Sequence, residues 1–196
     1  VPADARAVLR IDLDALRANW IYLNTQAGNA ECAGIVKADA YGHGAVAVAR
    51  TVLNAGVSGL CVALVQEAAE LRDGLIDAPV LVMSEQPPST AADAVRLGLI
   101  STVYSMAQLD VLEAAGARGH RVHVKVDTGM HRVGCAPADA LALVEDVERR
   151  EAFALDGVFT HLAVADEPSD PYTTLQLDRF DEVLAAIRAA GIDPGR

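Results

Sequence analysis

The chain has 196 residues, which is enough for one domain with a sizeable hydrophobic core. Apolar residues make up 52% of the sequence, a composition that excludes an intrinsically disordered chain. The formal net charge of −11 argues against nucleic acid or an anionic membrane surface as a partner, because both are negative and would repel the chain.

Helix-period runs and apolar strand-like runs alternate along the chain. A first helix is predicted over 14–26, with Asp12 or Asp14 as its N-cap. Strands are predicted over 32–38, 59–64, 79–83, 99–103, 121–127 and 155–161, and further helices over 44–55, 66–73, 88–97, 105–117, 137–150 and 173–190. This order indicates an α/β protein in which helices cover a parallel sheet.

The regular strand spacing of about 20–27 residues favours a (β/α)8 TIM-type barrel, with a doubly wound sheet as the alternative. About six βα units are found where a closed barrel has eight, so the predicted barrel is incomplete. We expect residues 1–196 to be one barrel domain of a longer polypeptide, lacking strands seven and eight. Dimerisation or a completing segment would cover the open sheet edges, which soluble proteins avoid leaving unpaired.

The cysteines and the apolar runs indicate the cellular compartment. Cys32, Cys61 and Cys135 are odd in number and widely spaced, so they are interpreted as free thiols of a reducing compartment and not as disulfides or metal ligands. No basic-then-apolar leader begins the chain, and the most apolar run, 56–65, is too short to cross a bilayer. We therefore expect a cytoplasmic protein without a bound metal.

The segment 36–44, VKADAYGHG, places Lys37 at the end of a predicted strand and before a glycine-broken turn. On one strand face Ile35, Lys37 and Asp39 would alternate inward, which brings the lysine to the barrel mouth. A lysine there can form an imine with a carbonyl cofactor, and the turn and helix start can hold a phosphate. Together these features suggest pyridoxal 5′-phosphate (PLP), although a lysine that simply reaches solvent beside an ordinary βα turn has the same pattern.

Charged residues also mark the predicted strand 121–127. Its even-numbered positions are valines suited to packing under helices, and its other face carries His123, Lys125 and Asp127. Inward charges are costly unless paired, so Asp127 is expected to pair with Lys125 or Arg132. Arg132 could bind a phenolate, a phosphate or a carboxylate through its planar fork, and a purely structural ion pair is the alternative.

Among the histidines, His161 is the candidate for function. It ends the predicted strand 155–161, where it could stack on a flat cofactor or shuttle protons, although a structural rim histidine fits equally. His120 and His123 are three positions apart on a strand, so they face opposite ways and cannot share a metal.

Taken together, three segments resemble signatures of the alanine racemase family. Residues 36–44 resemble its PLP-lysine signature, residues 125–134 (KVDTGMHRVG) resemble its second signature, and residues 160–163 (THLA) fit a third. Their order and spacing also agree, so the resemblance covers essentially the whole chain. It implies a homodimer in which each subunit joins an eight-stranded barrel to a C-terminal β domain, with the active site between subunits.

The resemblance also implies residue roles. Lys37 would link to PLP and act as the base on one face of the substrate. Tyr41 would bind the cofactor phosphate, Arg132 the phenolic oxygen and the substrate, and His161 would stack beside the pyridine ring. Lys125 corresponds to a lysine that is carbamylated in some members, a change that would turn a cation beside Arg132 into an anion and convert repulsion into an ion pair.

The activity implied is the PLP-dependent interconversion of L-alanine and D-alanine, an isomerase reaction that supplies D-alanine for peptidoglycan of the cell wall. Three elements of the family pattern lie outside residues 1–196: a serine of the seventh strand, an arginine of the eighth, and the partner's tyrosine that acts as second base. We therefore expect the isolated chain to be nearly inactive. A racemase for serine or another small amino acid, and a non-catalytic PLP carrier with a single barrel, are the alternatives.

Overall fold

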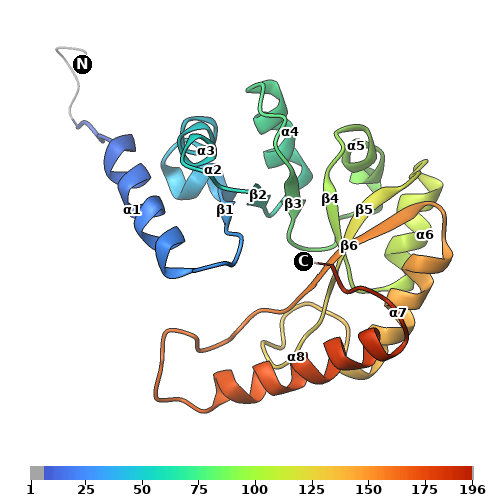
Figure 1. Ribbon diagram of the computed structural model, residues 1–196. Helices are drawn as coiled ribbons and strands as arrows, with labels where there is room; N and C mark the ends of the chain where they lie inside the picture. Colours follow the sequence, from blue (N-terminus) through green and yellow to red (C-terminus); the bar gives the residue numbers. More distant parts are fainter. Residues whose placement is uncertain (1–6, 196) are drawn as a thin grey trace. The chain divides into compact units, whose positions relative to one another are not determined.

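The computed structural model describes residues 7–195, in which six parallel strands alternate with helices (Figure 1). By its internal contacts the chain divides into two compact units. The first contains the residues up to Val62 together with Gln66–Val80, and the second contains Ala63–Val65 and the residues from Leu81 onward. The predicted alternation of strands and helices is confirmed.

The first unit pairs two parallel strands with four helices, the fourth of them only in part. Its elements are α1 (Leu13–Gln26), β1 (Ala33–Ile35), α2 (Lys37–Gly42), α3 (Ala45–Asn54), β2 (Gly59–Val62) and most of α4 (Val65–Asp73). The Asp12 carboxylate accepts a hydrogen bond from the Ala15 N–H at 2.9 Å, so Asp12 is the N-cap of α1. Gly34 in β1 lets α3 approach closely, because a Cβ there would lie 3.2 Å from a methyl group of Val52.

The second unit holds the larger part of the sheet. Its elements are the remainder of β3 (Val80–Val82), the short 3-10 helix η1 (Pro88–Thr90), α5 (Ala91–Arg96), β4 (Ile100–Val103), α6 (Met106–Ala114), β5 (His120–Lys125), α7 (Pro137–Arg149), β6 (Phe153–Phe159) and α8 (Tyr172–Ala189). From β3 to β6 each strand pairs in parallel with the next one along the chain. This order is that of an α/β barrel, here incomplete.

The hydrophobic core of the second unit lies between the sheet and its helices. Val122, Val124 and Val126 are completely buried, as the alternation along this strand predicts. Residues of α6, α7 and α8 complete the same cluster, among them Leu109, Val144 and Ile187. Among the described residues, no helix combines the length and the apolar character that crossing a bilayer requires.

Two predicted strands have different limits in the structure. The first was expected over 32–38, but β1 ends at Ile35 because the backbone then turns into a left-handed conformation. The last was expected over 155–161, but β6 runs from Phe153 to Phe159, and the Thr160 hydroxyl donates to the Val126 carbonyl beyond its end. Both changes matter at the candidate site, because they place Lys37 at the start of α2 and His161 in the loop after β6.

Candidate active site

Lys37 is followed by one turn of left-handed helix. Ala38, Asp39, Ala40 and Tyr41 have φ between 50° and 55° and ψ between 38° and 49°. This conformation costs L-residues roughly 1–2 kcal/mol each, and it is normally visited by single residues and not by runs. Strain of this kind persists only where surrounding contacts over-determine the backbone, and it gathers at functional sites.

Hydrogen bonds from both sides hold this turn. The Glu67 carboxylate of α4 accepts from the Ala38 N–H at 2.7 Å. The Asp39 carboxylate accepts from the Ala45 N–H at 2.6 Å and thereby caps α3, while the Asp39 carbonyl accepts from the Gly44 N–H at 2.9 Å. The turn is therefore anchored to α4 and to α3, the helix that follows it in the sequence.

The prediction that Ile35, Lys37 and Asp39 share one strand face is wrong. The strand ends at Ile35, and the Asp39 side chain is engaged at the start of α3 instead of pointing along a strand face. Lys37 is half-buried, and its Nζ lies 5.8 Å from the centre of the Tyr41 ring. The structure therefore brings together the two residues of this unit that the sequence singled out.

A pocket of about 450 Å³ adjoins the same turn. Tyr41 and His43 line it together with apolar side chains of α1, β1 and α3, including Trp20 and Val52. The His43 Nδ1 lies 2.9 Å from the Ala40 carbonyl oxygen, which fixes the ring against the turn. The first unit thus offers an amine, a phenol and an imidazole within one short segment.

In the second unit, β5 carries charge on the face opposite its valines, as predicted. Lys125 is buried, at 5% exposure, and its Nζ lies 5.2 Å from the centre of the Phe159 ring. The adjoining faces of β5 and β6 thus carry polar and aromatic side chains that are buried or half-buried.

Nearer the start of the same strands, the Asp156 side chain lies between those of Arg121 and His123. It accepts from Arg121 at 2.7 Å and lies 2.8 Å from the Nε2 of His123. It is also the extra residue of a local register shift, since Val122 pairs with Leu155 and His123 with Gly157. Burial alone would raise the pKa of Asp156, but the hydrogen bonds from His123 and Arg121 outweigh it and hold the pKa below its usual value.

Asp127 shapes the loop that follows β5. Its carboxylate accepts from the N–H groups of Gly129 and His131, both at 3.0 Å. Burial raises its pKa, but these backbone hydrogen bonds prevail and lower the pKa below its ordinary value. Gly134 closes the loop against the strand, where a Cβ would lie only 2.6 Å from the Asp127 nitrogen. Asp127 therefore has a structural role in this loop, and its pairing with Lys125 or Arg132 stays a prediction.

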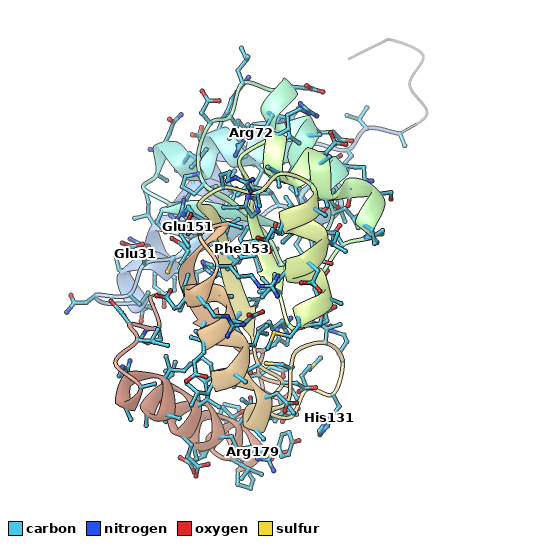
Figure 2. The ribbon with its side chains drawn as sticks, turned by 90° about the vertical axis from the view of Figure 1, so that its right-hand side faces the viewer. Glu31, Arg72, His131, Glu151, Phe153 and Arg179 are labelled. Carbon is cyan, nitrogen blue, oxygen red and sulfur yellow. The ribbon has the colours of Figure 1, made fainter. Side chains whose placement is uncertain are left out.

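Arg132 and His161 both lie beyond the carboxyl ends of neighbouring strands, the edge where active sites of parallel α/β folds are built. Arg132 is exposed in the loop after β5, and His161 is exposed just after β6. The two loops are joined by the hydroxyl groups of Thr128 and Thr160, which lie 2.8 Å apart. Figure 2 shows His131, of the same loop as Arg132, toward the same end of the second unit as Arg179 of α8.

Two residues that hold the candidate loops escaped the sequence reasoning. Glu67 binds the left-handed turn from 29 positions away, and no local pattern marks such a contact. Gln176 is completely buried on α8, in a helix for which no functional residue was predicted. A glutamine at a core position of an amphipathic helix is a usable signal, because buried amides need specific partners.

Six parallel strands in sequential order with alternating helices, and Lys37 directly after the first strand unit, place the chain in the class of α/β barrel proteins. Residues 11–196 match the family described as "Alanine racemase, N-terminal domain", and the chain belongs to this family.

Related proteins and solved structures agree with this family assignment. The chain is 42% identical over 194 residues to the alanine racemase of Thermobifida fusca, covering 96% of this chain and 52% of that protein. It is also 42% identical over 187 residues to the alanine racemase of Symbiobacterium thermophilum, covering 94% and 50%. The solved alanine racemase of Streptomyces coelicolor A3(2) has a TM-score of 0.87 and 38% identity, with 94% of this chain and 51% of that one covered. The chain thus spans about half the length of these relatives.

Proposed function

We propose that this domain is the barrel portion of an alanine racemase that uses PLP to interconvert L-alanine and D-alanine. The observation that carries the proposal is Lys37, held after the first strand by a strained left-handed turn in a sequence that matches the family's lysine signature. The donor set also fits the cofactor. The Lys37 amine can bond to the aldehyde of PLP, and the Tyr41 phenol can hydrogen-bond to its phosphate. The Arg132 guanidinium can bind its phenolic oxygen, and the His161 imidazole can stack beside its flat ring.

Lys37 would hold the cofactor's aldehyde carbon in a covalent bond to Nζ, and in its free amine form it would take the proton from the Cα of the substrate. When bound, PLP supplies an electron-withdrawing ring that stabilises negative charge at that carbon. The turn of residues 38–41 limits where Nζ can reach, because its backbone is tied to α3 and α4. A base fixed in this way acts on one face of the substrate only.

Tyr41, Arg132 and His161 would orient the bound groups. The Tyr41 hydroxyl would donate to the phosphate, and the Arg132 guanidinium would bind the phenolic oxygen and the substrate carboxylate. The His161 ring would stack beside the pyridine. The exposure of Arg132 and His161 supports these roles, because both side chains are open to a ligand at the carboxyl ends of β5 and β6.

We further propose a homodimeric, cytoplasmic enzyme in which the base for the opposite face of the substrate comes from outside residues 1–196. The free cysteines support a reducing compartment. Burial raises the pKa of Cys61 and of Cys135 to about 11, so these thiols stay protonated and unreactive.

The test is reductive trapping, which is simple to interpret within residues 1–196 because Lys37 and Lys125 are the only lysines there. Borohydride treatment of the complete protein with PLP, followed by peptide mapping, is expected to label Lys37. Lys125 is buried and serves as the internal control. In the Lys37→Ala variant we expect loss of the label, of the visible absorbance of lysine-bound PLP, and of racemase activity.

The outcomes separate the possible functions. Label at Lys37 without exchange of the alanine Cα hydrogen for solvent deuterium would favour a PLP carrier over a racemase. Faster exchange with serine than with alanine would change the substrate. An unlabelled Lys37 in the wild-type protein would end the assignment.

A further inference from the structure

Helix α8 contacts both loops that carry the proposed cofactor-binding residues of the second unit (Figure 1). Tyr172, Gln176 and Arg179 follow one another at helical spacing, so they lie on the same side of the helix. The Tyr172 hydroxyl donates to the Gly129 carbonyl at 3.0 Å, and Arg179 donates to the Thr128 carbonyl at 2.9 Å. Between these two contacts lies Gln176.

The Gln176 amide makes three hydrogen bonds while being completely buried. Its Nε2 donates to the His161 carbonyl at 3.0 Å and to the Thr128 hydroxyl at 3.3 Å. Its Oε1 accepts from the Ala163 N–H at 2.8 Å. Both donors and the acceptor of the amide are thus used, and this set of partners defines which way the amide faces.

Gln176 also begins a chain of hydrogen-bonded hydroxyls, those of Thr128 and Thr160, and the partners show which hydroxyl donates and which accepts. The Thr160 hydroxyl donates its single proton to the Val126 carbonyl at 2.9 Å. In its 2.8 Å contact with Thr128, Thr160 must therefore accept, and Thr128 must donate. The hydrogen bonds therefore all point the same way, from Gln176 through the hydroxyls of Thr128 and Thr160 to the Val126 carbonyl. Hydrogen bonds in such a chain strengthen one another in a buried setting.

We propose that Gln176 is a positioning residue for the cofactor site, which fixes the backbone of the loops that carry Arg132 and His161. This inference rests on the proposed function. Gln176 bonds directly to the His161 carbonyl and reaches the Arg132 loop through Thr128, four positions before the arginine. One buried amide therefore sets the place of two groups that would hold the cofactor ring and its phenolic oxygen.

The experiment compares Gln176→Met with a matched control in the complete protein. Methionine has a similar shape and cannot make the three hydrogen bonds. Ile187→Val lowers stability from the buried face of the same helix without touching either loop. The readouts are the dissociation constant of PLP, the thermal midpoint, and amide hydrogen exchange at 127–134 and 161–164.

We expect Gln176→Met to weaken PLP binding by at least roughly tenfold, the scale on which residues that orient a ligating group act. Amide exchange should accelerate in both loops, most of all at Ala163, which loses its acceptor. Ile187→Val should lower the thermal midpoint and leave both the PLP affinity and the loop exchange near wild-type values. If Gln176→Met does not fold, Thr160→Val breaks the same hydroxyl chain further along and should accelerate exchange in the 127–134 loop.

Unchanged loop exchange and PLP affinity in Gln176→Met would overturn the inference, and so would an equal loss of affinity in Ile187→Val. Failure of the proposed function has a different signature. In that case wild-type Lys37 would not be labelled by PLP and borohydride, while the exchange data would still show whether Gln176 holds the loops.

Discussion

Several polar side chains inside the second unit are matched by specific neighbours, and these matches constrain how the strands pair. Asp156 is bound by Arg121 and His123, and the buried Ser101 lies 2.9 Å from the Nε2 of His120. A buried polar group left without its partner costs about 1–3 kcal/mol, so a slipped register would be penalised at each of these positions. These side-chain pairs thus favour the observed strand register of the sheet that carries the candidate loops.

His120 should make stability depend on pH. Burial lowers the pKa of this histidine below its ordinary value of about 6.5, so the folded state resists its protonation. As the pH falls below about 6.5, the unfolded chain binds a proton that the folded chain does not, and the free energy of unfolding decreases. Urea unfolding at pH 7.5 and pH 5.5 should show this loss.

The matched variant is His120→Gln, which stays neutral at both pH values and can still hydrogen-bond to Ser101. It should show a clearly smaller loss of unfolding free energy between the two pH values than the wild-type protein. The depressed pKa values of Asp127 and Asp156 act in a separate window, because their stabilisation is lost only as the pH falls through the acidic range near and below 3.8. An equal pH response in His120→Gln would contradict the assignment to His120.

At the scale of single elements, α2 is the least ordinary part of the fold. Its backbone stays left-handed through four consecutive non-glycine residues, which intrinsic preferences strongly oppose. The compensation comes from hydrogen bonds that join it to α3 and α4. These hydrogen bonds fix the backbone that directly follows Lys37.

Glycine substitution should reveal the strain. Ala38 is exposed at φ 50°, so Ala38→Gly removes the Cβ that makes this conformation unfavourable. After the extra entropy of glycine in the unfolded chain is subtracted, we expect the free energy of unfolding to rise by about 0.5 kcal/mol.

The control is Ala47→Gly at an exposed position of the right-handed helix α3, where glycine should instead lower the free energy of unfolding by about 1 kcal/mol. Urea unfolding of both variants measures the contrast. A loss of stability in Ala38→Gly as large as that in Ala47→Gly would show that the left-handed turn stores no strain.

At the scale of the whole molecule, residues 1–196 contain the proposed base for one face of the substrate, and relatives of the family are about twice as long. We therefore expect purified residues 1–196 to take up PLP at Lys37 without racemising alanine at an appreciable rate. Chiral analysis of alanine after incubation measures this, with the complete protein as the positive control. Racemisation by residues 1–196 at the rate of the complete protein would show that both bases lie within them.

The sequence by itself determined the order of the elements and the location of the candidate groups. Apolar periodicity placed the helices and strands to within a few residues, and the alternation along β5 correctly separated the buried valines from the charged face. The signatures around Lys37 and Arg132 identified the family. These features are local, since each depends on residues close together in the chain.

Only the tertiary structure decided the conformation of residues 38–41 and the role of Gln176. Alanine and tyrosine do not favour a left-handed backbone, and the sequence indicated a turn after the predicted strand without indicating its left-handed conformation. Glu67 and Gln176 reach their partners across 13 to 48 positions of sequence. Contacts between distant residues can outweigh local preference, because several hydrogen bonds and packing contacts together offset the strain of a short segment.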